Sequence, residues 1–234
     1  MKLTPPEKSI KDDIQALTKG AISCIPGVGG VAAELFSMVV SPALDRRRQE
    51  WMTQVAQELT NLNNKIDASS WEALQQDEQF IDILLHATQI ALRTHQSEKH
   101  VALRNAVCNT ALNININYVQ KTMFLRFVDE LTVLHMKVLD ILNDPREWEK
   151  KNKYIFLQEP QGGILYMVEQ AIPEVFGLRE LLTLTIKDLQ VRGLLMEFPV
   201  NSSTMSWDDI MFERETGMGC AFRMFISKPI DNCP

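Results

Sequence analysis

The sequence predicts a mainly α-helical protein, an antiparallel helical array with an apolar N-terminal hairpin, followed by a winged-helix-like α+β module. Three observations predict this fold: an almost uncharged stretch at residues 20–44, apolar residues at helical spacing through the middle of the chain, and a change of pattern near residue 131. We therefore expect a helical domain over residues 1–130 and a second domain over residues 131–234. A chain of 234 residues can bury one large core or two modest ones.

Residues 20–44 contain a single ionisable side chain, Glu34. Pro26 and the glycines after it break the stretch, so it is too interrupted for a simple membrane-spanning helix. We expect a turn there, a helix over residues 31–40 and a second break at Ser41-Pro42. The resulting hairpin either packs inside a helical domain or lies against a membrane. The side chains expected to contact a partner or a membrane are Ile25, Val28, Val31, Leu35, Phe36 and Val39.

The middle of the chain has the apolar periodicity of long helices. One stripe repeats at spacings of 4, 4, 3 and 4, which predicts a helix from about residue 45 whose stripe packs within the protein; it consists of Trp51, Val55, Leu59, Leu62 and Ile66. A second helix opens at Phe80 and could run to Leu112. The tract "LNININ" at residues 112–117 predicts a bend, and a new helix begins near Tyr118.

After residue 131 the pattern becomes shorter and more varied. A compact helix ends at Asp144-Pro145, a charged loop covers residues 146–163, and two further helices cover residues 164–177 and 178–195. We expect "LMEFPV" to be a strand and "GMGCAFRMFISKP" to be a returning strand. One face of that returning strand would carry Cys220, Phe222, Met224 and Ile226.

Three helices followed by a two-stranded ribbon resemble the winged-helix family over about residues 131–228, including "DLQVRGLL" and "TGMGCAFRMFI". The resemblance implies a third helix that faces either DNA or a protein. For DNA, the candidate residues are Arg179, Lys187 and Arg192. The segment that would form the wing tip, "NSSTMSWDDIMFERET", is acidic, whereas a wing that grips the DNA backbone needs Lys or Arg.

The whole layout is similar to bacterial proteins with a helical N-terminal region and a C-terminal winged-helix module. More loosely, it is similar to the abortive-infection alpha type of phage-defence protein, in stretches such as "FLRFVDELTVLHMKVLDIL". This resemblance implies a bacterial defence or stress role. The expected location is the cytoplasm, with the inner face of the membrane as an alternative site for the hairpin.

Motifs for catalysis, cofactors and metals are weak. Gly27, Gly29 and Ala32 have the spacing of a dinucleotide-binding turn, but the flanking strand and the later acidic residue are missing. His95 and His100 are five residues apart, which places them on different faces of a helix. The four cysteines form no C-x-x-C pair. We therefore expect no cofactor, no metal and no small-molecule substrate.

The sequence thus predicts a non-enzymatic interaction protein that binds a protein partner or a second copy of itself, with a membrane as a further possible partner. The alternative is a winged-helix DNA-binding transcriptional regulator. A net charge of −6 and a pI near 5.3 argue against a protein that holds nucleic acid without sequence preference.

Overall fold

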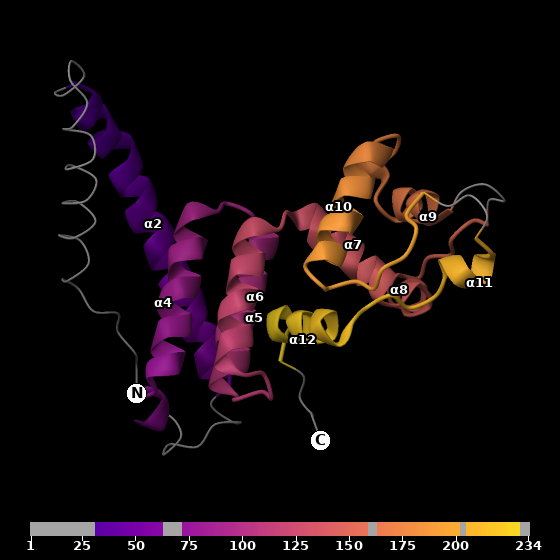
Figure 1. The fold of residues 1–234 in the computed structure, drawn as a ribbon. Coiled ribbons are helices and arrows are strands. Elements are labelled where there is room, and N and C mark those ends of the chain that lie inside the picture. The colour runs from indigo at the N-terminus through magenta and orange to yellow at the C-terminus, as the bar shows by residue number, and fades with distance from the viewer. Residues whose placement is uncertain (1–30, 63–71, 159–162, 202–204, 230–234) are drawn as a thin grey trace. The chain divides into compact units, whose positions relative to one another are not determined.

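The structure is a computed structural model that describes residues 31–62, 72–158, 163–201 and 205–229, with side chains from residue 43 onward. It is mainly helical, as predicted (Figure 1). Its principal elements are α2 (Val31–Asn61), α4 (Glu78–Arg93), α5 (Ser97–Ala111), α6 (Tyr118–Glu130), α7 (Val133–Asn143), α8 (Pro145–Asn152), α9 (Gly163–Ala171), the 3₁₀ helix η1 (Pro173–Val175), α10 (Arg179–Val191), α11 (Trp207–Ile210) and α12 (Gly217–Ile226).

The chain divides into two compact units, one up to His95 and one from Gln96 onward. The boundary predicted from the sequence, at residue 130, lies within the second of these units. That unit includes α5 and α6 because both helices pack against α12, close to the C-terminus.

The first unit contains α2 packed against α4. The predicted stripe on α2 is confirmed as buried for Trp51, Val55, Leu59 and Leu62, whereas Ile66 lies outside the described residues. The Trp51 indole N–H donates to the Thr88 hydroxyl at 2.9 Å, which satisfies its one polar group inside the apolar contact.

The predicted break at Ser41-Pro42 is wrong, because α2 runs without interruption from Val31 to Asn61. A proline removes one hydrogen bond of the helical ladder and can kink a helix without ending it. The first part of the expected hairpin, residues 20–30 with Ile25 and Val28, lies outside the described residues. No helix in the described part of the chain is long and apolar enough to cross a membrane.

The single helix expected from Phe80 to Leu112 is in fact two helices. The chain leaves the helical conformation at Thr94, whose φ of −101° and ψ of 152° are extended, and α5 begins at Ser97. Arg93 in the last turn of α4 and Glu98 in the first turn of α5 each have the charge that favours a helix end at that point. By contrast, the predicted bend at residues 112–117 and the start of α6 at Tyr118 are confirmed.

The second unit has an aromatic core where α5, α6 and α12 meet. Phe124 of α6 packs against Phe222 and Phe225 of α12, with ring centroids 5.5 and 5.8 Å apart. All three rings are fully buried.

The C-terminal end of α12 is held by two amides of α5. The Asn109 side-chain nitrogen donates to the carbonyls of Met224, Phe225 and Ser227 at 3.0, 2.9 and 2.8 Å. Asn105 donates to the Ile226 carbonyl at 2.8 Å. Carbonyls at a helix C-terminus have no partner within their own helix, so these two side chains satisfy groups that would otherwise be unpaired.

The predicted winged-helix module is wrong, because "GMGCAFRMFI" forms the helix α12 and the described residues contain no strand. Only an isolated bridge between Leu195 and Glu215 stands where the ribbon was expected. The buried residues of α12, Gly219, Phe222 and Phe225, are three apart, which is a helical face. Met224, which the strand assignment placed beside Phe222, is exposed.

Two further segments expected to be irregular are helical. The charged loop begins with α8, where Asp144 caps the helix by accepting the Glu147 N–H at 3.0 Å and Pro145 takes the first helical position. The polar segment before α12 contains α11, which is capped by Ser206. Both helices begin with a capping residue followed by acidic residues in the first turn.

A substitution at Gly219 tests whether α12 lies close to the Leu194 carbonyl. A methyl group there would lie 2.2 Å from the Leu194 carbonyl oxygen, so Gly219→Ala should lower the free energy of unfolding by about 2–3 kcal/mol. Urea unfolding followed by circular dichroism measures this. Gly217→Ala is the matched control, since its methyl group would meet no atom within 4 Å. It should leave stability unchanged or raise it by up to about 1 kcal/mol, because alanine favours a helix. Equal effects of the two substitutions would contradict the close approach.

Candidate functional site: the outer face of α10

The three basic residues expected to face DNA all belong to α10 or its C-terminal cap, and the structure gives them different roles. Arg179 pairs with Glu169, with two nitrogen–oxygen distances of 3.4 Å. The Glu169 side chain is only 2% exposed and also accepts the Gly177 N–H. The Arg179 guanidinium therefore neutralises a buried carboxylate, because an uncompensated charge there would be strongly destabilising.

Arg192 is held still more firmly. Its guanidinium donates to Glu130 at 2.7 Å and to Asp188 at 3.1 Å, and it lies 5.4 Å from the centre of the Phe127 ring. The hydrogen bond to Glu130 is the main reason why the pKa of Arg192 is raised above its ordinary value. Lys187 differs from both, since its ammonium group has no ion-pair partner in the described part of the chain.

The solvent-facing side of α10 carries three large apolar residues together with the charged residues Glu180 and Lys187. Leu181, Leu184 and Val191 follow one another at spacings of three and seven, and the last two are 66% and 83% exposed. We call these three residues the outer face of α10. The opposite side of the same helix holds the buried residues Leu182, Thr185, Ile186 and Leu189.

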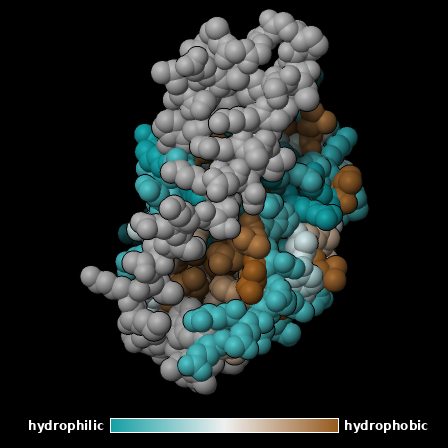
Figure 2. All heavy atoms as spheres, turned by 90° about the vertical axis from the view of Figure 1, so that its left-hand side faces the viewer, coloured by the Kyte–Doolittle hydropathy of each residue, from teal (hydrophilic) through white to brown (hydrophobic). Residues whose placement is uncertain are grey.

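This apolar surface continues toward the N-terminal end of the helix, where Phe176 and Leu178 are also exposed. Single exposed apolar residues are common, and Figure 2 shows apolar side chains at the surface on the α2 side of Figure 1 as well. What sets α10 apart is that large apolar side chains repeat along the outward side of one helix. Such repetition is typical of a surface that another molecule covers.

A polar cluster lies along another edge of α10. The His135 ring nitrogen Nε2 is 3.3 Å from an Asp188 oxygen, and its Nδ1 is 2.7 Å from the Thr132 hydroxyl. Because Nδ1 also accepts the Thr132 backbone N–H, the proton of the neutral ring sits on Nε2 and is donated to Asp188.

Hydroxyl, imidazole and carboxylate lie here in the order used for nucleophilic catalysis, although no motif in the sequence predicts this arrangement. Thr132 is, however, the residue that caps α7. Its hydroxyl oxygen accepts the backbone N–H of His135, and the ring nitrogen Nδ1 of His135 accepts the backbone N–H of Thr132. Reciprocal hydrogen bonds of this kind are a capping box, which explains the geometry by local structure.

Metal binding has no support in the part of the chain that the structure describes. No group of three or more histidine, cysteine or acidic side chains could hold an ion there. His95, proposed and rejected as a ligand from its spacing, lies in the exposed link between α4 and α5. The apolar candidates Val31, Leu35, Phe36 and Val39 belong to the helical backbone of α2.

Comparison with family models, with curated proteins and with solved structures found no match for this chain. The resemblance to phage-defence proteins therefore stays a prediction from the sequence.

The state of His135 gives a prediction about pH. Burial lowers its pKa below the ordinary 6.5, with Arg192 and Lys99 adding to this effect and Asp188 opposing it. As the pH falls below about 6.5, the unfolded chain takes up this proton before the folded chain does, so stability is lost as the pH falls through the folded pKa. His135→Gln should flatten this part of the dependence. Urea unfolding at a series of pH values between about 5 and 8 measures it.

His95→Gln is the control for that experiment, because it removes an exposed imidazole from outside the cluster. If the two variants and the wild type lost the same stability over this pH range, His135 would not be the responsible group.

Proposed function

We propose that this chain is a protein-interaction module that performs no chemistry of its own and binds its partner through the outer face of α10. The observation that carries the proposal is the exposure of Leu184 and Val191 on one side of a helix whose other side is buried. Covering these side chains removes apolar surface from water, which is the main favourable contribution to protein association.

The charges around this face indicate the chemistry of the partner. Glu174, Glu180 and Glu197 are exposed on the elements that border it, whereas Lys187 is the cation without an ion-pair partner among the described residues of α10. The chain as a whole carries a net charge of −6. An amphipathic helix with Leu-type residues on one side and Lys or Arg along its borders would therefore complement both the apolar face and its acidic surroundings.

The ion pairs of Arg179 and Arg192 support a protein partner over DNA. Both guanidinium groups are already engaged with carboxylates, so binding phosphate would require breaking these pairs. A cytoplasmic location, expected from the sequence, and a role in bacterial defence, taken from the sequence resemblance, belong to this proposal as its biological setting.

A peptide titration tests the proposal. A fluorescein-labelled amphipathic Leu/Lys helix should bind the full chain, and Leu184→Glu should weaken this binding by about tenfold or more, as expected for a central apolar contact. Fluorescence anisotropy measures both affinities. The substitution adds a negative charge, so purely electrostatic attraction to the basic peptide would become stronger instead.

Val119→Glu is the matched control, since Val119 of α6 is 74% exposed and lies outside the proposed face. It makes the same change of charge and polarity elsewhere on the surface. Equal affinities of the Leu184→Glu and Val119→Glu proteins for the peptide would remove the outer face of α10 as the binding surface.

A further inference from the structure

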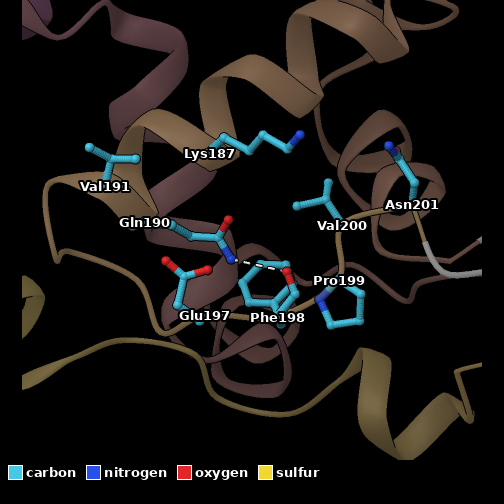
Figure 3. A pocket seen from close by; sticks show the side chains of 8 residues that line it. All are labelled: Lys187, Gln190, Val191, Glu197, Phe198, Pro199, Val200 and Asn201. Carbon is cyan, nitrogen blue, oxygen red and sulfur yellow. Dashed lines mark hydrogen bonds between the residues drawn. The ribbon is translucent and has the colours of Figure 1, made fainter.

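A hollow lies beside the outer face of α10, between that helix and the segment at residues 197–201 (Figure 3). We call it the α10 pocket. Its volume is about 620 Å³, which is within the range of small-ligand sites. Its lining residues are Lys187, Gln190, Val191, Glu197, Phe198, Pro199, Val200 and Asn201.

The amide of Gln190 leaves an acceptor unused in this pocket. Gln190 is only 8% exposed, and its side-chain nitrogen donates to the carbonyls of Met196 and Phe198 at 3.1 and 3.2 Å. Because nitrogen faces two carbonyls, the assignment of the amide atoms is unambiguous. The oxygen lies on the Lys187 side in Figure 3 and receives no hydrogen bond from the described residues. A buried acceptor without a donor is unfavourable, so this atom favours a ligand that carries an N–H group.

The charged groups of the pocket are separated. In Figure 3 the Lys187 side chain extends toward Asn201, whereas the Glu197 carboxylate lies beyond Gln190 at the other end. The Asn201 side-chain oxygen accepts the Thr183 hydroxyl at 3.2 Å, which leaves its NH₂ group as a donor. One end therefore offers an ammonium and an amide donor, and the other offers acceptors.

The surface between these ends is apolar and fixed in place. Val191, Phe198, Pro199 and Val200 line it, and Val200 is buried. The Arg214 guanidinium lies 5.0 Å from the centre of the Phe198 ring, and the Met196 N–H donates to the Arg214 carbonyl at 2.8 Å. The segment that forms this wall is thus held from behind, which lowers the cost of ordering it on binding.

From this arrangement we propose that the α10 pocket binds a dipolar ligand with a carboxylate at one end, an apolar side chain in the middle and an N–H or ammonium group at the other. The carboxylate pairs with Lys187 and Asn201. The apolar group packs on Val200 and Phe198, and the N–H donates to Gln190. A cationic group next to it meets Glu197. Both the C-terminus of a peptide and a free amino acid have this chemistry.

Calorimetric titration of the full chain tests the proposal with three probes: the dipeptide Lys-Leu, its C-terminal amide, and leucine. Lys-Leu should bind, and amidation should weaken its binding by about tenfold because the charged partner of Lys187 is lost. In Lys187→Gln the free dipeptide should bind as weakly as the amide does, and amidation should have no further effect. If the affinity difference between Lys-Leu and its amide disappears in Lys187→Gln, then Lys187 is the group that contacts the carboxylate.

Lys150→Gln is the matched control, because this lysine lies on α8 with 75% of its side chain exposed; it should bind all probes as the wild type does. Leucine that binds as tightly as Lys-Leu would assign the site to free amino acids, and weaker leucine binding would assign it to peptide C-termini. Equal affinities of Lys-Leu and its C-terminal amide for the wild-type protein would overturn the proposal. So would the absence of binding heat from every probe at about 10 mM.

The experiment is independent of the proposed helix-binding face. Leu184→Gln should bind Lys-Leu as the wild type does, since Leu184 does not line the pocket and the substitution places no carboxylate three residues before Lys187. Failure of the helix titration with retained dipeptide binding would therefore reject the interaction surface and leave the pocket intact.

Discussion

The hydrogen bonds from Asn109 to the end of α12 fix the arrangement of the second unit. This side chain lies in the last turn of α5, is buried, and donates to three carbonyls more than 100 residues later in the chain. Without this donor, the Phe225 carbonyl would be buried beside an aromatic core with no partner. The hydrogen bonds of Asn109 therefore allow α12 to pack its aromatic rings against Phe124.

The N-terminal end of α12 and the residues just before it contact the segment that leads from α10 to the pocket. The hydroxyl of Thr216 caps α12 and also donates to the Gly193 carbonyl just beyond α10, and Gly219 allows the Leu194 carbonyl to approach the helix. Arg214, whose pKa burial lowers to about 10, donates to carbonyls at the end of α11 and lies against Phe198. Arg214, just before α12, thus holds the wall of the α10 pocket, while Thr216 and Gly219 hold the residues that lead into it.

Local signals in the sequence predicted much of the helical structure but not the site. The stripe from Trp51 to Leu62 followed from its spacing, and the start of α6 near Tyr118 followed from the helix-breaking tract at residues 112–117. The strand predicted over residues 217–229 is wrong because "CAFRMFI" places apolar residues on one side both at the two-residue period of a strand and at the 3.6-residue period of a helix. Only long-range contacts with Asn109 and Phe124 distinguish the two. Lys187 was named for its charge alone. The free oxygen of Gln190 had no signal in the sequence, since it depends on which carbonyls its nitrogen meets.

Hydrogen exchange of the α12 amides, followed residue by residue by NMR, tests the central claim most directly. If Asn109 and the aromatic core hold α12 as a helix, the amides of residues 221–226 exchange only through global unfolding, and Asn109→Ala makes them exchange through local opening while those of α6 remain protected. Amides of residues 221–226 that exchange as fast as an exposed loop in the wild-type protein would contradict the account, because α12 could then not support the pocket wall.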